Sequence, residues 1–215
     1  MEATKILMEE HRVIERVIDA IEVAARRLDS DPSIRAGFFL DAADFIREFA
    51  DGCHHRKEEG VLFPAMEAAG VPKKGGPIGV MLTEHEEGRR LTRGMRTAAE
   101  KLATGDEAAR DEVQRNALGY VNLLRQHIMK EDSVLFPMAD RVIRDQERAE
   151  VADAFERLQQ EETAKGVQEK YLGVAESLVN DGQVVGDGFP NVAERFFRYF
   201  GMKTTCYLHS HFGVT

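Results

Sequence analysis

Residues 54–64 read HHRKEEGVLFP, and residues 127–137 read HIMKEDSVLFP. Both stretches place a histidine four positions before a glutamate, and a Leu-Phe-Pro begins four positions after that glutamate. Side chains four residues apart lie on the same face of an α-helix. Each stretch therefore offers an imidazole and a carboxylate to one point in space, which is the arrangement of half a metal site.

The rest of the first 140 or so residues repeats with nearly the same spacing. His11 lies in an apolar stripe typical of a bundle helix, and His85 lies in a second such stripe 74 residues later. His127 and Glu131 follow His54 and Glu58 by 73 residues. The sequence therefore predicts two helical hairpins of the same design that differ in length by one residue.

This repeat predicts an all-α fold. Two such hairpins pack as an up-down-up-down four-helix bundle whose ligands project into the core. We expect a kink or an early end at Pro64, which lacks a backbone donor, and a C-terminal cap at Gly105. The four helices are expected over 2–28, 33–66, 78–102 and 106–142. We assign residues 1–144 to this bundle and residues 145–215 to a mainly helical extension of unknown role, with helices over 145–162, 167–180 and 192–200.

Composition excludes several classes of protein. The hydrophobic fraction of 43% with 31% charged residues is typical of a soluble globular chain. A net charge of −9 argues against nucleic acid or an anionic membrane as partner. The chain contains no apolar run long enough to span a membrane, and we expect its amphipathic start to be part of the fold rather than a signal peptide. Its two cysteines cannot form a disulfide framework, so we expect a cytoplasmic protein.

Six side chains at equivalent positions of the two hairpins form one candidate metal site: His11, His54, Glu58, His85, His127 and Glu131. Buried carboxylates are costly unless they share a cation or a proton. Four imidazoles with two carboxylates match a two-metal site in which the carboxylates bridge and each metal holds two histidines. These ligands suit two non-haem iron ions, with manganese or zinc as alternatives.

Other polar side chains nearby are open to two interpretations. His55 has i, i+4 spacing with Glu59 but aligns with Ile128, so we expect it behind the ligands or on the surface. Tyr120 lies about two turns before His127 and is either a hydrogen-bond donor at the site or a core tyrosine. We expect Cys53 to be a small core residue. We expect the cluster of Cys206, His209 and His211 to be an exposed tail.

These residues resemble the hemerythrin-like (HHE cation-binding) family over about residues 4–142. The resemblance rests on four elements in order, with Leu-Phe-Pro after each glutamate: His11, His54-x-x-x-Glu58, His85 and His127-x-x-x-Glu131. It implies a non-haem di-iron centre in an up-down-up-down bundle. Family members bind dioxygen or nitric oxide, sense oxygen or iron, or support repair of iron–sulfur centres under nitrosative stress.

One departure from the oxygen carriers of this family concerns Arg89. The carriers have a second histidine at this position, one turn after the third-helix ligand. Its loss implies an extra open position or a solvent ligand on the second metal, and it argues against simple oxygen carriage.

Three functions follow as hypotheses. The first is a di-iron protein that binds dioxygen, nitric oxide or peroxide in an oxidative or nitrosative stress response or in iron handling. The second is a redox enzyme at the same centre, for peroxide removal, iron–sulfur centre repair or oxidation of a small substrate, with Tyr120 as proton donor. The third is an iron store or sensor that acts through residues 145–215. The aromatic run 196–200 either packs back on the bundle or forms a homodimer contact.

Overall fold

Helix α1 (Glu2–Arg27) carries the apolar stripe that the sequence predicts, with His11 in the middle of its buried face. The computed structural model describes residues 1–182, and every regular element in that range is helical. The described part of the chain is therefore all-α. None of its helices is long and apolar enough to cross a membrane.

The second helical segment runs from residue 36 to residue 68 as four elements in succession. They are α2 (Ala36–Phe45), the π-helical stretches η1 (Ile46–His55) and η2 (Glu58–Leu62), and α3 (Phe63–Ala68). The early end expected at Pro64 is not found, because the helix continues to Ala68. The irregularity precedes the proline instead. The Phe63 amide donates to the Glu58 carbonyl, five residues back, just before the residue that has no donor.

The second hairpin follows the same plan. Helix α4 (Pro77–Ala103) is followed by Gly105, whose φ of +95° and hydrogen bond to the Leu102 carbonyl fit the expected C-terminal cap. In the returning segment the Phe136 amide donates to the Glu131 carbonyl, as Phe63 does to Glu58. That segment consists of the short turn η3 (Glu107–Ala109), α5 (Arg110–Lys130), the π-helical η4 (Glu131–Leu135) and α6 (Phe136–Val142).

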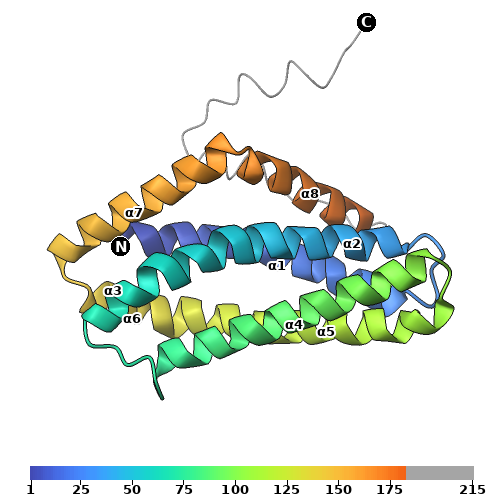
Figure 1. Cartoon of the computed structure of the whole chain (residues 1–215), viewed down its shortest axis with the longest axis horizontal. Helices are drawn as coiled ribbons and strands as arrows, with labels where there is room; N and C mark the ends of the chain where they lie inside the picture. Colours follow the sequence, from blue (N-terminus) through green and yellow to red (C-terminus); the bar gives the residue numbers. More distant parts are fainter. Residues whose placement is uncertain (183–215) are drawn as a thin grey trace, which may run out of the picture.

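The four long segments lie side by side along the longest axis of the molecule, and consecutive segments run in opposite directions (Figure 1). α4 packs against α5 and α2, and α1 packs against α5. The histidines at positions 11, 54, 85 and 127 come one from each segment. This arrangement directs all four toward one interior.

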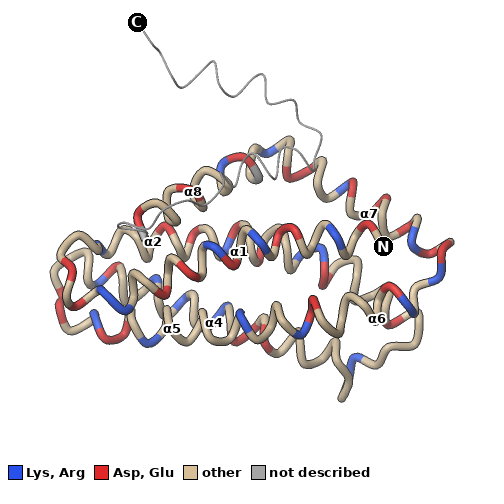
Figure 2. Tube along the Cα trace, turned by 180° about the vertical axis from the view of Figure 1, so that it is seen from behind, with Lys and Arg blue, Asp and Glu red and all other residues tan. Residues whose placement is uncertain are grey.

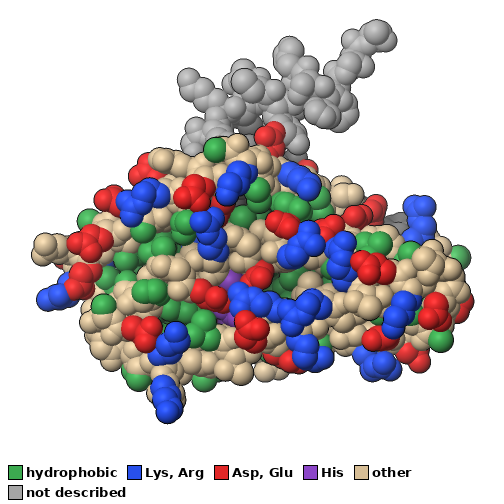
Figure 3. All heavy atoms as spheres, in the orientation of Figure 1, with side chains coloured by type: hydrophobic (Ala, Val, Ile, Leu, Met, Phe, Trp, Pro, Cys, Tyr) green, Lys and Arg blue, Asp and Glu red, His purple; other side chains and the backbone are tan. Residues whose placement is uncertain are grey.

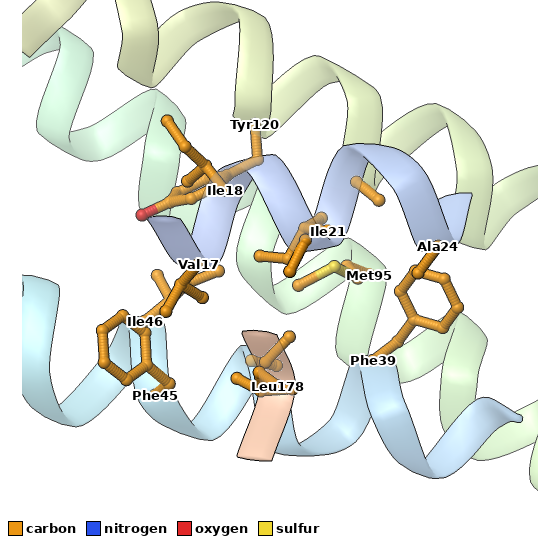
Figure 4. Packing of buried hydrophobic residues seen from close by; sticks show 14 of the residues in the cluster. Val17, Ile18, Ile21, Ala24, Phe39, Phe45, Ile46, Met95, Tyr120 and Leu178 are labelled. Carbon is orange, nitrogen blue, oxygen red and sulfur yellow. The ribbon is translucent and has the colours of Figure 1, made fainter. Parts of the chain in front are cut away.

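Apolar side chains fill that interior on both sides of the histidines. In the larger cluster, Val17 of α1 lies beside Ile46, Ile21 lies beside Met95 of α4, and Ala24 lies beside Phe39 of α2 (Figure 4). The smaller cluster lies at the other end and contains the leucine and phenylalanine of both Leu-Phe-Pro sequences. Fully burying such a side chain stabilises the fold by about 1.5–3 kcal/mol. The two clusters hold the polar centre between them and keep water from its ends.

The described part of the C-terminal extension is helical and lies along α1 and α2 (Figure 1). Helices α7 (Asp145–Ala164) and α8 (Val167–Gly182) confirm the predicted helices at 145–162 and 167–180. Phe155 of α7 joins the smaller apolar cluster, and Leu178 of α8 joins the larger one. The predictions for 192–200 and for Cys206, His209 and His211 lie outside the described residues. Acidic and basic positions are both found along the described helices (Figure 2), and α7 has a clear acidic excess, with seven acidic and two basic residues.

Candidate metal centre

The six predicted side chains come together in the core, and His55 joins them. Two groups of four side chains each hold their ligand atoms within 4.8 Å of one another. We call them the His11 group (His11, His54, Glu58 and Glu131) and the His85 group (His55, Glu58, His85 and His127). All seven side chains are buried. The groups share Glu58, so they adjoin each other across one carboxylate.

The two glutamates lie between the groups. The Glu131 oxygens lie 3.2 Å from Nε2 of His11 and 3.2 Å from Nε2 of His127. The Glu58 oxygens lie 3.6 Å from Nε2 of His54 and 3.5 Å from Nε2 of His85. Each carboxylate thus turns one oxygen toward each group, which is the arrangement that a bridging ligand of two metals requires.

The expectation that His55 lies behind the ligands or on the surface is wrong. Only 6% of His55 is exposed, and its ring stacks on that of His85 with 3.8 Å between centroids. The reason is the π-helical stretch η1, in which the Arg56 amide donates to the Asp51 carbonyl, five residues back. An α-helical repeat turns only one of two consecutive histidines inward, whereas the wider turn lets His54 and His55 both face the core.

The position of His55 also bears on the open metal position that we expected from Arg89. Arg89 lies one turn after His85, but its guanidinium turns outward and donates to Asp51 and Glu59. His55 enters the His85 group from the neighbouring segment instead. The His85 group therefore has a third imidazole, and the inference of an additional open position from Arg89 alone does not hold.

Replacing His55 with isoleucine, the residue at the equivalent position 128, should weaken metal binding in the His85 group. One imidazole is lost, so we expect at least a tenfold loss of affinity for one of two ions, with the helical content unchanged. Metal titration followed by elemental analysis of the dialysed protein measures this. The control is Ile128→Val, which should bind metal as the parent does. Equal metal affinity in H55I and the parent would exclude His55 from the site.

Every histidine of the two groups forms a hydrogen bond through its Nδ1 atom to a carboxylate. The N–O distances run from 2.6 to 3.2 Å for the pairs His11–Asp132, His54–Glu10, His55–Asp51, His85–Glu59 and His127–Glu84. A carboxylate only accepts, so Nδ1 carries the proton and Nε2 has a free lone pair toward the centre. This is the carboxylate–histidine arrangement that orients metal-binding imidazoles.

Each of these carboxylates also accepts a hydrogen bond from a lysine or an arginine. Glu10 accepts from Lys57, Glu84 from Lys130, Asp132 from Arg12, and Asp51 and Glu59 both accept from Arg89. The pairs follow the internal repeat, because Glu10 and Lys57 correspond to Glu84 and Lys130. These charge-assisted hydrogen bonds hold the carboxylates in place, and the carboxylates in turn fix the orientation of the imidazoles.

The two equivalent lysines, Lys57 and Lys130, differ in exposure and in the number of carboxylates they bind. Lys57 is 0% exposed and donates to Glu162 of α7 at 2.8 Å as well as to Glu10 at 2.9 Å. The side chain of Lys130 is 34% exposed and bonds to Glu84. The extension therefore reaches the His11 group through three linked side chains, Glu162, Lys57 and Glu10.

The two buried carboxylates of the centre, Glu58 and Glu131, favour a positive charge between them. Burial and the neighbouring Glu131 raise the pKa of Glu58 well above its usual value. Burial opposes ionisation of Glu131 too, but His127 and His11 hold its pKa well below the usual value. Burial lowers the pKa of His127, yet Glu131 and Glu84 outweigh it and raise that pKa to about 9. In the metal-free chain the positive charge beside Glu131 comes from these histidines, and a cation bound at their Nε2 atoms would take its place, whereas Glu58 has no such compensation.

The donor atoms at the centre also lack partners within the described chain. Nε2 of His11, Nε2 of His54 and both oxygens of Glu58 and Glu131 are buried without a hydrogen bond. Nε2 of His85 lies 3.1 Å from Nε2 of His127, close to the ~3 Å between adjacent nitrogens that bind one metal at about 2.1 Å. Unpaired buried polar atoms are costly. These residues therefore fit a pair of metal cations.

A cavity of about 210 Å³ reaches the His85 group from the surface between η1 and α4. His55, His85 and His127 line its inner end, and no residue that belongs to the His11 group alone lines it. Figure 3 shows histidine atoms in the middle of this face, flanked by acidic and basic side chains. Access from this cavity is therefore to one half of the centre.

Tyr120 is a core residue that also lines this cavity. Its side chain is 1% exposed and its hydroxyl has no hydrogen-bond partner in the described chain. Burial raises the pKa of the phenol above its usual value, so the proton stays on the oxygen. Both interpretations of Tyr120 are compatible with this position. Cys53 is a buried core residue, as expected, and burial raises the pKa of its thiol to about 12.

Comparison with known proteins agrees with this geometry. Residues 2–139 match the sequence model of the hemerythrin HHE cation binding domain. The chain belongs to the hemerythrin HHE family. This match spans the four segments that carry the two ligand groups and ends before α7. The family's description as cation-binding agrees with the unpaired donors in the core.

Uncharacterized proteins from Mycobacterium bovis and from two strains of Mycobacterium tuberculosis are similar to this hemerythrin HHE chain. Each is 32% identical over 154 residues, which is 72% of this chain and 60% of the relative. The chain therefore spans well under two thirds of the length of these relatives. No solved structure matches it.

Proposed function

We propose that this protein is a non-haem di-iron protein that binds a small ligand, dioxygen, nitric oxide or peroxide, in an oxidative or nitrosative stress response or in iron handling. The observation that carries this proposal is the pair of adjoining ligand groups that share a buried carboxylate. We further infer that the four segments form the up-down-up-down four-helix bundle of the hemerythrin family.

In this proposal the His11 group would hold one ion and the His85 group the other, and Glu58 and Glu131 would serve both groups. Imidazole with carboxylate suits iron, and manganese or zinc would fit the same donors. Bound iron would supply redox chemistry and free coordination positions for a small ligand.

The chain's own residues would control what reaches the centre. The carboxylates at Nδ1 fix each imidazole, and the apolar clusters on either side exclude bulk water. The cavity gives a small molecule a route to the His85 group. Tyr120 lines this route with an unpaired hydroxyl, so it would donate a hydrogen bond to a ligand bound there.

Replacing Tyr120 with phenylalanine should weaken ligand binding while stabilising the fold. The hydroxyl is buried without a partner, a state that costs about 1–3 kcal/mol, so Y120F should unfold at a higher urea concentration. Its affinity for nitric oxide or azide should fall about fivefold to tenfold, because one hydrogen bond of roughly 1 kcal/mol or slightly more is lost. Urea melts and ligand titrations measure the two effects. If ligand affinity is unchanged, Tyr120 is only a core residue.

Metal analysis and ligand titration of the purified protein test the proposal. We expect two irons per chain and near-ultraviolet absorption that changes when azide or nitric oxide is added. The control is the double variant His85→Leu/His127→Leu, which removes two imidazoles of the His85 group and should abolish the change. A protein that folds but retains no more than one metal after iron loading would contradict a di-iron centre.

The cavity beside the His85 group also favours a second function, redox catalysis on a small substrate. Turnover of peroxide or of an added organic substrate by the iron-loaded protein would support it. Ligand binding without turnover would leave the binding function alone.

A further inference from the structure

We propose that the cavity beside the His85 group binds a small organic anion, a monocarboxylate with an apolar body of several carbon atoms. This names a ligand class for the site of the proposed function. Only the effect of the bound anion on the metal centre rests on that proposed function. Size is the first observation. The cavity holds about 210 Å³, whereas one water occupies about 30 Å³ in the liquid. A diatomic ligand or peroxide would fill a small part of it.

Part of the cavity wall is apolar. This part consists of Ala43 and Ile46 from the α2–η1 segment, Gly88 from α4, and Leu123 and Leu124 from α5. Gly88 adds width, because a Cβ at this position would already contact the Tyr120 ring at 3.6 Å. Such walls favour aliphatic or aromatic carbon over a hydrated ion.

The mouth of the cavity is basic. Arg47 of η1 and Arg89, Arg93 and Arg96 of α4 all line it. Arg93 has no hydrogen bond or ion pair with any residue of 1–182, and Arg47 and Arg96 share one carboxylate, that of Asp44. Their other partners, Glu48 and Glu100, are next to them on their own helices. Exposed pairs of this kind contribute little stability and exchange readily for a ligand.

The acidic residues of the cavity do not cancel this charge. Asp51 accepts two hydrogen bonds from Arg89 and one from His55, and Glu84 is paired with Lys130 and His127. Each lining carboxylate therefore has its own cation. Arg93 is available for an anion, and Arg96 can exchange one of its exposed carboxylate partners for one. A guanidinium binds a carboxylate through two parallel hydrogen bonds.

The order of these features along α4 sets the orientation of the ligand. Arg93 and Arg96 lie eight and eleven residues after His85, or about 12 and 16 Å along the helix. A long arginine side chain covers part of this distance. A carboxylate of about six carbons bound at the arginines would place its apolar end near the histidines and the Tyr120 hydroxyl.

The test is a titration of the full-length protein, as purified, with sodium hexanoate, followed by calorimetry. Acetate has the charge without the apolar body, and hexan-1-ol has a similar body without the charge. The mouth variant is Arg93→Gln/Arg96→Gln. The control variant is Arg90→Gln, on the same helix but outside the cavity and paired with Glu87.

We expect hexanoate to bind at least tenfold more tightly than acetate or hexan-1-ol, because four more methylenes are buried and a charge-assisted pair is formed. R93Q/R96Q should lose at least tenfold in hexanoate affinity and R90Q should lose none. Bound hexanoate should also slow the reaction of the centre with azide. Equal hexanoate affinity in R93Q/R96Q and R90Q would overturn the inference, and so would hexanoate binding no tighter than hexan-1-ol.

The two proposals fail separately. The metal content and azide spectrum are measured on the same samples. An intact di-iron centre with no hexanoate binding would leave the proposed function standing and remove the ligand class. If the chain lacks two irons but still binds hexanoate through the arginines, the ligand class would stand and the proposed di-iron function would be removed.

Discussion

Replacing Glu131 with glutamine is expected to reduce the metal content from two ions per chain to fewer than one. Glu131 lies 3.2 Å from a histidine of each group, so its charge and its oxygens serve both ions. Loss of an outer partner alone typically costs 10- to 100-fold in metal affinity, and loss of a bridging ligand should cost more than about 100-fold. Elemental analysis after dialysis measures the change.

Stability of the metal-free protein separates this effect from unfolding. Glu131 is fully buried and its oxygens have no hydrogen bond in the described chain. Glutamine keeps the shape of the side chain, so metal-free E131Q should retain the helical content of the metal-free parent, measured by circular dichroism. The control is Glu87→Gln on the exposed face of α4, which should retain both ions. Two ions in E131Q would refute the bridging role.

The second large effect is expected from replacing Lys57 with methionine. Lys57 is 0% exposed and lies between Glu10 and Glu162, so its loss leaves two buried carboxylates without their cation. Breaking a buried ion pair in this way costs about 3–5 kcal/mol. Glu10 holds His54, so metal binding in the His11 group should weaken as well. Urea unfolding and metal titration measure the two effects.

The internal repeat supplies the control for Lys57. Lys130→Met removes the equivalent lysine, whose side chain is 34% exposed and pairs with one carboxylate, and it should cost about 1 kcal/mol or less. Adding Glu162→Gln to Lys57→Met removes one of the two stranded charges and should restore part of the stability. Equal losses in K57M and K130M would show that contact with α7 adds nothing to the site.

Much of the fold and of the site could be predicted from the sequence. The constant offsets identified six side chains, and the structure brings His11, His54, His85 and His127 together with both glutamates. The helix bounds agree within a few residues because each stripe of apolar positions has the α-helical period. These features depend on local periodicity, which a single sequence displays.

The position of His55 does not follow from α-helical spacing. The first hairpin has one residue more between its ligands than the second, and η1 has the five-residue hydrogen bond that accommodates such an extra residue. The difference between the offsets of 74 and 73 is therefore the signal for His55. The sequence alone shows this difference only as a difference in hairpin length.

Four of the five carboxylates at Nδ1 could have been found from the sequence, whereas Asp51 and Glu162 could not. Glu10, Glu59, Glu84 and Asp132 each adjoin a predicted ligand in sequence, at positions that the repeat conserves between its two halves. Glu162 lies in the charge-rich α7, where no motif distinguishes it from its neighbours. Its role depends on how α7 packs over Lys57, which is a tertiary contact.

Anomalous X-ray diffraction from crystals of the iron-loaded protein, collected at the iron edge, would locate the metal ions. We expect two peaks about 3.5–4 Å apart, one among His11 and His54, the other among His55, His85 and His127, with Glu58 and Glu131 between them. One peak, or two peaks outside these groups, would contradict this expectation.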